Sequence, residues 1–202
     1  MKIKSTVQPH YNRLIKKHPQ LETLPILDAF FMLKTTYESG GKVLVCGNGG
    51  SAADAEHIVG ELMKGFLVPR KVEDPRLAHI PGLQGALPAI ALTGHTALSL
   101  AFANDVNPAL IFAQQVFGYG KSDDTLICIS TSGNAENVIM AAKTAKALGI
   151  KVIGMTGITG GNLAEHCDLL LNVPENETMY VQELHLPLYH GLCAMLEAEF
   201  FV

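Results

Sequence analysis

The 202-residue sequence has no stretch approaching the ~20 consecutive apolar residues that a membrane-spanning helix needs. No apolar block follows the first residues, so no secretory signal is predicted. The four cysteines form no CxxC pair, which disfavours both a disulfide framework and a structural zinc site. They are widely spaced: Cys46, Cys128, Cys167 and Cys193. These absences predict a cytoplasmic protein with free, buried thiols and no membrane partner.

Charge of one sign is missing from each end of the sequence. Residues 1–21 contain no Asp or Glu, whereas residues 152–202 contain no Lys or Arg and seven acidic residues. The formal net charge of −4 gives no general attraction for nucleic acid, so no nucleic-acid partner is expected. The basic first segment could contact RNA, DNA or an acidic surface, but a solvated first helix is the favoured interpretation.

After residue 40, short apolar runs alternate with helical patterns. The runs are Lys42–Cys46, Pro88–Leu92, Leu126–Ile129, Val152–Met155 and Leu169–Val173. The helical patterns cover Ala52–Met63, Ala109–Phe117, Ala135–Leu148, Asn162–Glu165 and Thr178–Phe200. Continuous apolar runs suit parallel strands that are covered on both faces. The chain is therefore predicted to form one α/β domain, a parallel sheet with helices on both faces.

Two segments lie outside this alternation. Residues 1–40 are predicted to form an N-terminal helical segment, with an amphipathic helix at 20–39 that ends at the pair Gly40–Gly41. Residues 66–87 hold three prolines and show no sustained period, which favours an extended loop that is either a lid or interface segment or a plain mobile insertion. Apolar positions on helices 20–39 and 178–200 exceed what one small sheet needs. They predict a homotetramer, or at least a dimer, with these helices at the interfaces.

A glycine-rich turn follows the first predicted strand, and Ser51 stands where the next helix should start. The turn contains Asn48, Gly49 and Gly50. Helix N-termini offer unpaired N–H groups, and glycines let an anion approach the backbone, so this turn predicts phosphate binding. The spacing Gly47-x-Gly49-x-x-Ala52 also loosely fits a dinucleotide fingerprint. The second strand ends without the acidic residue that a nicotinamide site requires, which disfavours that alternative.

A second polar turn, Ser130-Thr131-Ser132, follows the third predicted strand. Its three hydroxyls can donate to phosphate oxygens without adding charge. Alone, it could equally be a Ser/Thr-rich turn before an Asn cap. Two such turns at the carboxyl ends of parallel strands favour one shared phosphate site at the switch point of the sheet.

Two further groups of polar residues lie on predicted helices. His57 and Glu61 have the i, i+4 spacing that puts an imidazole and a carboxylate on one helix face, close enough to share a metal or a substrate. On the last helix, Gln182 and His190 stand in apolar surroundings. They are eight residues apart, ~12 Å along the helix axis, so their spacing alone does not suggest a joint site.

Taken together, these residues make the chain resemble the sugar isomerase (SIS) domain family and, within it, the phosphoheptose isomerases. The segments CGNGGSAADAEH, AFANDV, STSGN and VQELHLPLYH occur in the family's order. The resemblance implies a single SIS domain over residues 1–202, with a five-stranded flavodoxin-like sheet. It also implies a homotetramer with active sites between subunits, and aldose–ketose isomerisation of a sugar phosphate, most like sedoheptulose 7-phosphate.

The resemblance also implies roles for individual residues. A divalent metal, usually zinc, would be held by His57, Glu61, Gln182 and His190. Glu61 would be the catalytic base and His190 its acid/base partner. The phosphate would be held at the residues Gly49, Gly50, Ser51, Ser130, Thr131 and Ser132. Asn48 and the pair Asn104–Asp105 would lie near the sugar.

The chain departs from the family pattern at several positions. Ala135 and Met179 stand where a phosphate-binding Ser and a substrate-contacting Asp are expected. Lys64-Gly65-Phe66 replaces a stretch that normally offers Arg, the 66–87 connection is long, and Pro187 is predicted to interrupt and bend the last helix. These departures leave open an isomerase for another sugar phosphate. A non-catalytic relative that binds phosphosugars or proteins, like the bacterial replication-initiator-associating protein, is also an alternative, although that protein lacks the Glu and the last His.

Overall fold

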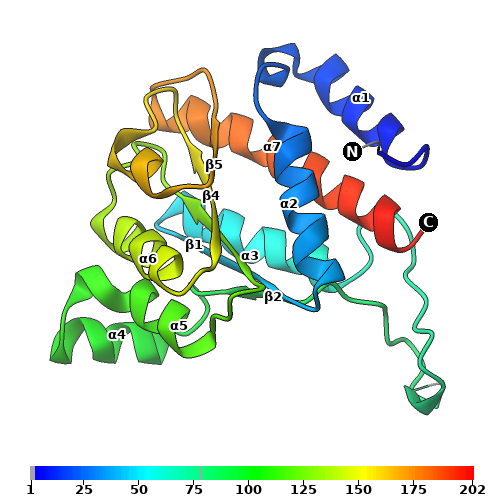
Figure 1. The fold of residues 1–202 in the computed structure, drawn as a ribbon, viewed down its shortest axis with the longest axis horizontal. Helices are drawn as coiled ribbons and strands as arrows, with labels where there is room; N and C mark the ends of the chain where they lie inside the picture. Colours follow the sequence, from blue (N-terminus) through cyan, green and yellow to red (C-terminus); the bar gives the residue numbers. More distant parts are fainter. Residues whose placement is uncertain (1–2, 78) are drawn as a thin grey trace.

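A computed structural model describes residues 3–77 and 79–202. At its centre is a five-stranded parallel sheet with the order β2-β1-β3-β4-β5 (Figure 1). The strands are β1 (Val43–Gly47), β2 (Ala89–Ala91), β3 (Thr125–Ile129), β4 (Lys151–Thr156) and β5 (Leu169–Asn172). All five coincide with the predicted apolar runs to within two residues at each end. The predicted parallel sheet and single α/β domain are therefore confirmed.

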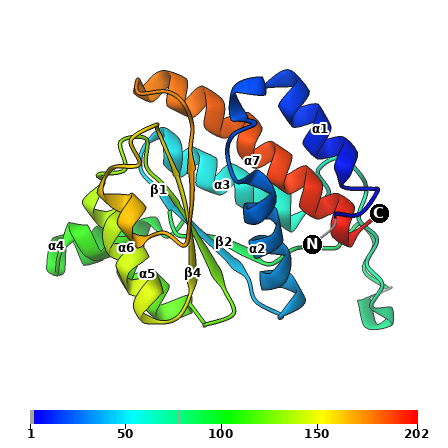
Figure 2. The same cartoon turned by 45° about the horizontal axis from the view of Figure 1, so that its top comes forward.

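Helices cover both faces of the sheet (Figures 1 and 2). On one face, α2 (Ile26–Glu38), α3 (Gly50–Met63) and α7 (Thr178–Phe200) pack against Val43 and Val45. On the other face, α5 (Ile111–Tyr119) and α6 (Glu136–Ala147) pack against Leu44 and Cys46. The alternation along β1 follows from the two-residue period of a strand, and every residue of β1 is buried.

The N-terminal segment forms two helices rather than one long one. Helix α1 (Gln8–Lys17) is followed by the short 3₁₀ turn η1 (Pro19–Leu21) and then by α2. The predicted helix at 20–39 therefore starts later, directly after Pro25, and its end before Gly40 is as predicted. Gly40 has φ +77°, a conformation that L side chains rarely adopt, which explains why the helix stops there.

The sequence analysis missed helix α4 (Thr96–Asp105), and the structure refines two other helical predictions. The apolar residues of α4 are spread around the helix rather than gathered on one face, so the sequence shows no helical period there. The 3₁₀ turn η3 (Pro108–Leu110) precedes α5, and the short helical pattern after Gly160 is the 3₁₀ helix η4 (Gly161–His166).

The last helix runs continuously through Pro187, so the predicted interruption is wrong. Packing holds α7 together, because it lies between α1, α2 and α3 and all of residues 191–199 are buried. Among the described residues, no helix is both long and apolar enough to cross a bilayer.

The 66–87 connection projects away from the body of the protein and carries the short turn η2 (Pro75–Leu77) (Figure 1). Its first residues, in contrast, are firmly attached. The Glu197 carboxylate on α7 accepts hydrogen bonds from the backbone N–H groups of Phe66, Leu67 and Val68 at 2.7, 2.7 and 3.2 Å. The connection is therefore anchored at its start, whereas its role as a lid or an interface stays a prediction.

Candidate active site

The two polar turns predicted from the sequence lie side by side, because β1 and β3 are neighbours in the sheet. They line one pocket of about 330 Å³ at the carboxyl ends of these strands, which we call the cradle. Its lining residues are Asn48, Gly49, Gly50, Ser51, Ile129, Ser130, Thr131, Ser132, Ala135, Thr178 and Gln182. The cradle therefore combines the first turn of α3, the β3–α6 turn and the start of α7.

Local backbone features make the first turn suitable for an anion. Gly49 has φ +55° and, as the residue before α3, provides no side-chain cap, which leaves first-turn amides available to a ligand. The helix begins at Gly50, so buried Ser51 lies within its first turn. A side chain at Gly50 would collide with Gln182, since a Cβ there would lie 2.5 Å from Nε2. Glycine at this position lets α7 approach the turn.

The rim of the cradle is formed by side-chain amides. Asn48 and Asn137 exchange two hydrogen bonds of 2.8 and 2.9 Å. Ser132 accepts a bond from the backbone N–H of Asn134 at 3.2 Å. Ala135 also lines the cradle, and its methyl group offers no hydrogen-bond donor to a ligand.

A second group of polar side chains, the histidine cluster, brings together the middle of α3 and the middle of α7. His57 Nε2 lies 3.2 Å from Glu61 Oε1 and 3.4 Å from His190 Nε2. Glu61 is nearly buried, and its second oxygen lies 3.4 Å from Lys64 Nζ. Three residues predicted to act together are thus in direct contact.

Tyr189 and Asp54, which the sequence analysis did not single out, extend this cluster. The Tyr189 hydroxyl donates to Asp54 Oδ1 at 3.2 Å and lies 2.9 Å from His57 Nδ1. A hydroxyl has one proton to donate, so His57 Nδ1 must carry a proton and donate it to the Tyr189 oxygen. In that tautomer Nε2 of His57 faces the Glu61 carboxylate at 3.2 Å, the position at which a proton or a metal would join the two groups.

Burial adjusts the pKa values around the cluster. Burial, followed by the neighbouring His57, lowers the pKa of His190 below its ordinary value, which favours a neutral imidazole. Burial also raises the pKa of Asp54 despite its bond from Tyr189. The pKa of Tyr189 is raised by burial and by Asp54, so its hydroxyl keeps its proton.

Gln182 and His190 join different parts of the site, as their spacing on one helix requires. Gln182 lies against Gly50 in the cradle, while His190 contacts His57. Across the described residues, no group of three or more His, Cys, Asp and Glu side chains is placed so that it could hold a metal ion as it stands. The donors of the histidine cluster are nonetheless of the right kind for zinc. Their spacings of 3.2 and 3.4 Å are close to the ~3.3 Å edge of a tetrahedron with bonds of about 2.0–2.1 Å.

An arginine in the 66–87 connection ties α3 to α7, and it was not predicted from the sequence. Arg70 is 2% exposed and donates to the backbone carbonyls of Glu61 and Leu62 at 2.8 and 2.6 Å. Its Nε donates to the Glu197 carboxylate at 2.8 Å. Arg70 thereby caps the last turn of α3, which carries Glu61, and ties it to α7, which carries His190. Only its three-dimensional partners reveal this role.

The predicted pair Asn104–Asp105 lies away from the site in this chain, and so does a third polar residue, His185 on α7. Asn104 and Asp105 are at the exposed end of α4, where they hydrogen-bond to each other at 2.8 Å, and neither lines the cradle. Within one chain, Asn104 and Asp105 therefore do not lie next to the cradle, where the sugar was predicted to bind. His185 is buried and contacts the Thr156 carbonyl at 3.3 Å. Burial lowers its pKa to about 4, so it is a neutral core residue.

Comparison with known proteins places this site in a family. The family model described as SIS domain matches residues 9–157. The phosphoheptose isomerase of Clostridium acetobutylicum is 45% identical over 165 residues, which is 82% of this chain and 77% of that protein. That of Rhodospirillum rubrum is 40% identical over 172 residues, 85% of this chain and 84% of that protein.

Solved structures agree with these relatives. A phosphoheptose isomerase from Francisella tularensis has 36% identity and a TM-score of 0.77, covering 94% of this chain and 95% of that one. The phosphoheptose isomerase GmhA from Neisseria gonorrhoeae has 36% identity and a TM-score of 0.73, with 93% and 95% covered. With its parallel sheet, its cradle and its relatives all in agreement, the chain belongs to the SIS domain family, alongside the phosphoheptose isomerases.

Proposed function

We propose that the chain interconverts sedoheptulose 7-phosphate and the corresponding aldose 7-phosphate. The observation that carries this proposal is the placement of the cradle and the histidine cluster on the same two helices. Ser51 and His57 are six residues apart on α3, a rise of ~9 Å. A sugar phosphate anchored in the cradle can therefore extend its carbon chain along α3 to Glu61.

The proposed reaction moves one proton between adjacent carbons. Glu61 removes a proton from C1 of the ketose, giving an enediol, and returns a proton to C2 to form the aldose. His190, held neutral by burial, moves the proton between the oxygens on C1 and C2. Phosphate binding in the cradle supplies binding energy far from the reacting carbons and orients them.

We further propose a divalent metal, with zinc as the first candidate, held by His57, Glu61 and His190 before the sugar binds. A group cannot accept a proton at an atom bound to a metal, so Glu61 would act through its other oxygen and His190 would release the metal when it moves protons on the sugar. The fit is supported by the two facing acceptors of His57 and Glu61 and by the Tyr189 oxygen that fixes the His57 tautomer. Gln182, the predicted fourth ligand, has its described contacts in the cradle. When bound, such a metal supplies Lewis-acid stabilisation of negative charge on the sugar oxygens.

One observation favours a second candidate, isomerisation of another sugar phosphate. Met179, which replaces an expected substrate-contacting Asp, is 56% exposed at the start of α7, next to Thr178 in the cradle. An apolar side chain there cannot bond a sugar hydroxyl. A phosphosugar with fewer or differently placed hydroxyls would lose less binding energy when Met179 replaces the Asp.

We also propose that the protein acts in the cytoplasm as a homo-oligomer, with a tetramer expected. The apolar residues of α2 and α7 on which the interface prediction depended are largely buried within the chain, so that argument no longer holds. Helix α4 gives a better one. It has no buried residue. Leu100 on α4, Val106 directly after it and Phe117 on α5 are 64–66% exposed. An interface there would also bring Asn104 and Asp105 to a neighbouring chain.

The test is product formation from a panel of ketose and aldose phosphates, with and without added zinc. Sedoheptulose 7-phosphate is expected to turn over fastest. Ser130→Ala should raise its KM about tenfold or more, since one bond to a charged oxygen is lost. Ser122→Ala, on an exposed turn, is the matched control and should leave the KM unchanged. Failure of every phosphosugar to react would move the chain to the non-catalytic class.

A further inference from the structure

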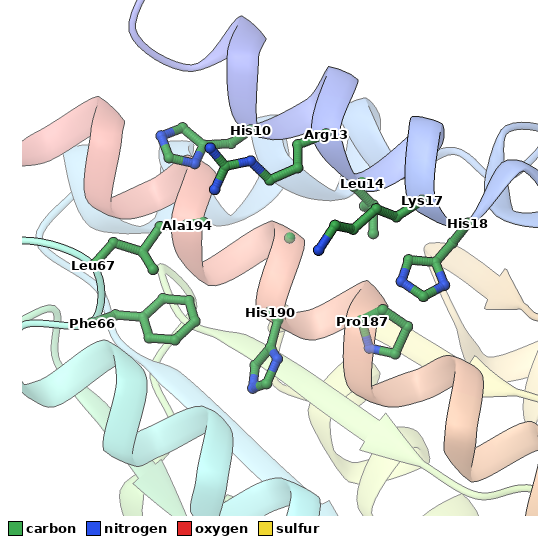
Figure 3. A pocket seen from close by; sticks show the side chains of 11 residues that line it. His10, Arg13, Leu14, Lys17, His18, Phe66, Leu67, Pro187, His190 and Ala194 are labelled. Atoms are coloured by element: carbon green, nitrogen blue, oxygen red, sulfur yellow. The ribbon is translucent and has the colours of Figure 1, made fainter.

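A second pocket, separate from the cradle, lies between α1, α7 and the start of the 66–87 connection (Figure 3). Its volume is about 320 Å³, at the lower end of the range of about 300–1,000 Å³ typical of small-molecule sites. We call it the basic pocket. Its lining residues are His10, Arg13, Leu14, Lys17, His18, Phe66, Leu67, Pro187, His190, Gly191 and Ala194. It shares no residue with the cradle, but His190 links it to the histidine cluster.

The polar side chains of the basic pocket are all basic or imidazole. His10, Arg13 and Lys17 come from one face of α1, and His18 follows directly; no Asp or Glu is among the lining residues. Figure 3 shows them arranged around a common space above His190. The remaining lining is mostly apolar, and the Phe66 and His190 rings lie 5.4 Å apart. The pocket thus combines a cationic rim with an apolar base.

Two simpler explanations do not account for this charge. Pairing with the acidic α7 does not account for it. The acids of α7 pair with Lys4, Lys34 and Arg70, and among the described residues no carboxylate lies within ion-pair distance of Arg13 or Lys17. The helix dipole favours Lys17 in the last turn of α1 but not Arg13 in its middle.

Without a ligand, this arrangement is unfavourable. Arg13 and Lys17 have the i, i+4 spacing at which like charges destabilise a helix. Burial, followed by the neighbouring Arg13, lowers the pKa of His10, while Glu197 acts in the opposite direction. An anion between these side chains would turn the repulsion into attraction.

We propose that the basic pocket binds a small organic phosphate, with its phosphate among Arg13, Lys17 and His18 and its carbon skeleton against Phe66 and Leu14. Arginine and lysine form charge-assisted bonds with phosphate oxygens, and the apolar base suits a short carbon chain. The bound ligand contacts His190 without entering the cradle. It is either a second molecule of the sugar phosphate or a different phosphate compound. The small volume argues against a nucleic acid.

The test follows the imidazole NMR signals of His10 and His18 during a titration with inorganic phosphate, at fixed pH and ionic strength, with chloride as the comparison anion. The wild type and the cradle variant Ser130→Ala/Ser132→Ala should both show saturating shifts with phosphate and none with chloride. Arg13→Gln and Lys17→Gln should each raise the Kd about tenfold, because each removes one charged bond. Lys143→Gln, on α6, makes the same charge change away from the pocket and should leave the Kd unchanged.

Sedoheptulose 7-phosphate, titrated into the cradle variant, separates the two sources. Matching shifts at His10 and His18 would assign the ligand to the substrate class, whereas shifts with inorganic phosphate alone would assign it to another phosphate compound. Shifts that vanish in the cradle variant, equal shifts with chloride, or the same Kd for Arg13→Gln and Lys143→Gln would each overturn the proposal. None of these readouts depends on turnover. The binding result therefore stands even if the isomerase proposal fails.

Discussion

At the scale of single residues, the central feature is the chain of contacts from Asp54 through Tyr189 to His57. It directs the lone pair of His57 toward Glu61 and His190, the two groups proposed to handle protons. Metal-ligating histidines depend on such outer partners, which fix the ring orientation and the tautomer. Tyr189 therefore acts as a positioning residue for His57 in the proposed site.

The Tyr189→Phe variant tests this positioning. It keeps the ring packing against His57 and His190 but removes the oxygen that accepts from His57 Nδ1. We expect zinc affinity, measured by competition with a chelator, to fall about 10–100-fold. Tyr37→Phe is a matched control, because the buried Tyr37 hydroxyl has no partner among the described residues. Equal zinc affinity for both variants would contradict the role of Tyr189.

How far the site could be predicted from the sequence differs from residue to residue. The cradle could be predicted, because two Gly/Ser turns that follow parallel strands must meet at one sheet edge. The contact of His57 with Glu61 follows from helical spacing. The contact of His57 with His190 does not, because 133 residues separate them; the family resemblance supplied it. Asp54 and Tyr189 carried no signal, since only the packing of α3 on α7 makes them partners.

At the scale of elements, the position of Glu61 depends on how α3 ends. Arg70 donates to the carbonyls of the last turn of α3 and to Glu197 of α7, and its guanidinium also lies 4.7 Å above the Phe201 ring. Residues 66–87 show no period in the sequence and were predicted as a loop. Nothing in that pattern indicates the buried ion pair between Arg70 and Glu197, which are 127 positions apart. Helix α4 was missed because its apolar residues are spread around the helix rather than gathered on one face.

Breaking this ion pair should cost much of the stability of the protein. Arg70→Met leaves the Glu197 carboxylate buried without its cation, and we expect a loss of about 3–5 kcal/mol in the free energy of unfolding by urea. The double variant Arg70→Met/Glu197→Leu should recover only part of this loss, because the N–H groups of Phe66 and Leu67 then have no acceptor. Full recovery would show that the backbone bonds to Glu197 contribute little.

The same carboxylate predicts how stability depends on pH. Burial alone would raise the pKa of Glu197, but hydrogen bonds from Phe66 and Leu67 and the Arg70 guanidinium together lower it below its ordinary value. Because the folded pKa is lower than the unfolded one, the stabilisation is complete above the unfolded pKa and disappears as the pH falls through the folded pKa. We therefore expect urea midpoints to fall below about pH 4.5. Glu197→Gln should lower the midpoint at neutral pH and flatten this acid decline; an unchanged decline would exclude Glu197 as its source.

At the scale of the whole molecule, one group of exposed large apolar side chains lies on α4 and α5. Leu98, Leu100 and Val106 lie on or next to α4, and Phe117 and Tyr119 lie on α5; all are at least 36% exposed. Isolated exposed apolar residues are ordinary, but α4 is an apolar helix with no buried residue, and the proposed oligomer would cover it.

This surface predicts the effect of two substitutions on assembly. Leu100→Ser/Phe117→Ser should lower the molar mass measured by light scattering, because both side chains are 66% exposed in the single chain and would be buried in an interface. Leu148→Ser, at the end of α6, provides the control and should leave the mass unchanged. A monomeric wild type at micromolar concentration would contradict the proposed oligomer altogether.

The account as a whole claims that Glu61 moves a proton on a sugar phosphate held in the cradle. Proton NMR of sedoheptulose 7-phosphate, incubated with the protein in D₂O, tests this claim directly. The wild type should form the aldose 7-phosphate with deuterium at C2, because the proton removed by Glu61 exchanges with solvent before its return. Glu61→Gln should slow this reaction about 10²–10⁴-fold, as expected for a lost general base. Undiminished conversion by Glu61→Gln, or no conversion by the wild type, would contradict the account.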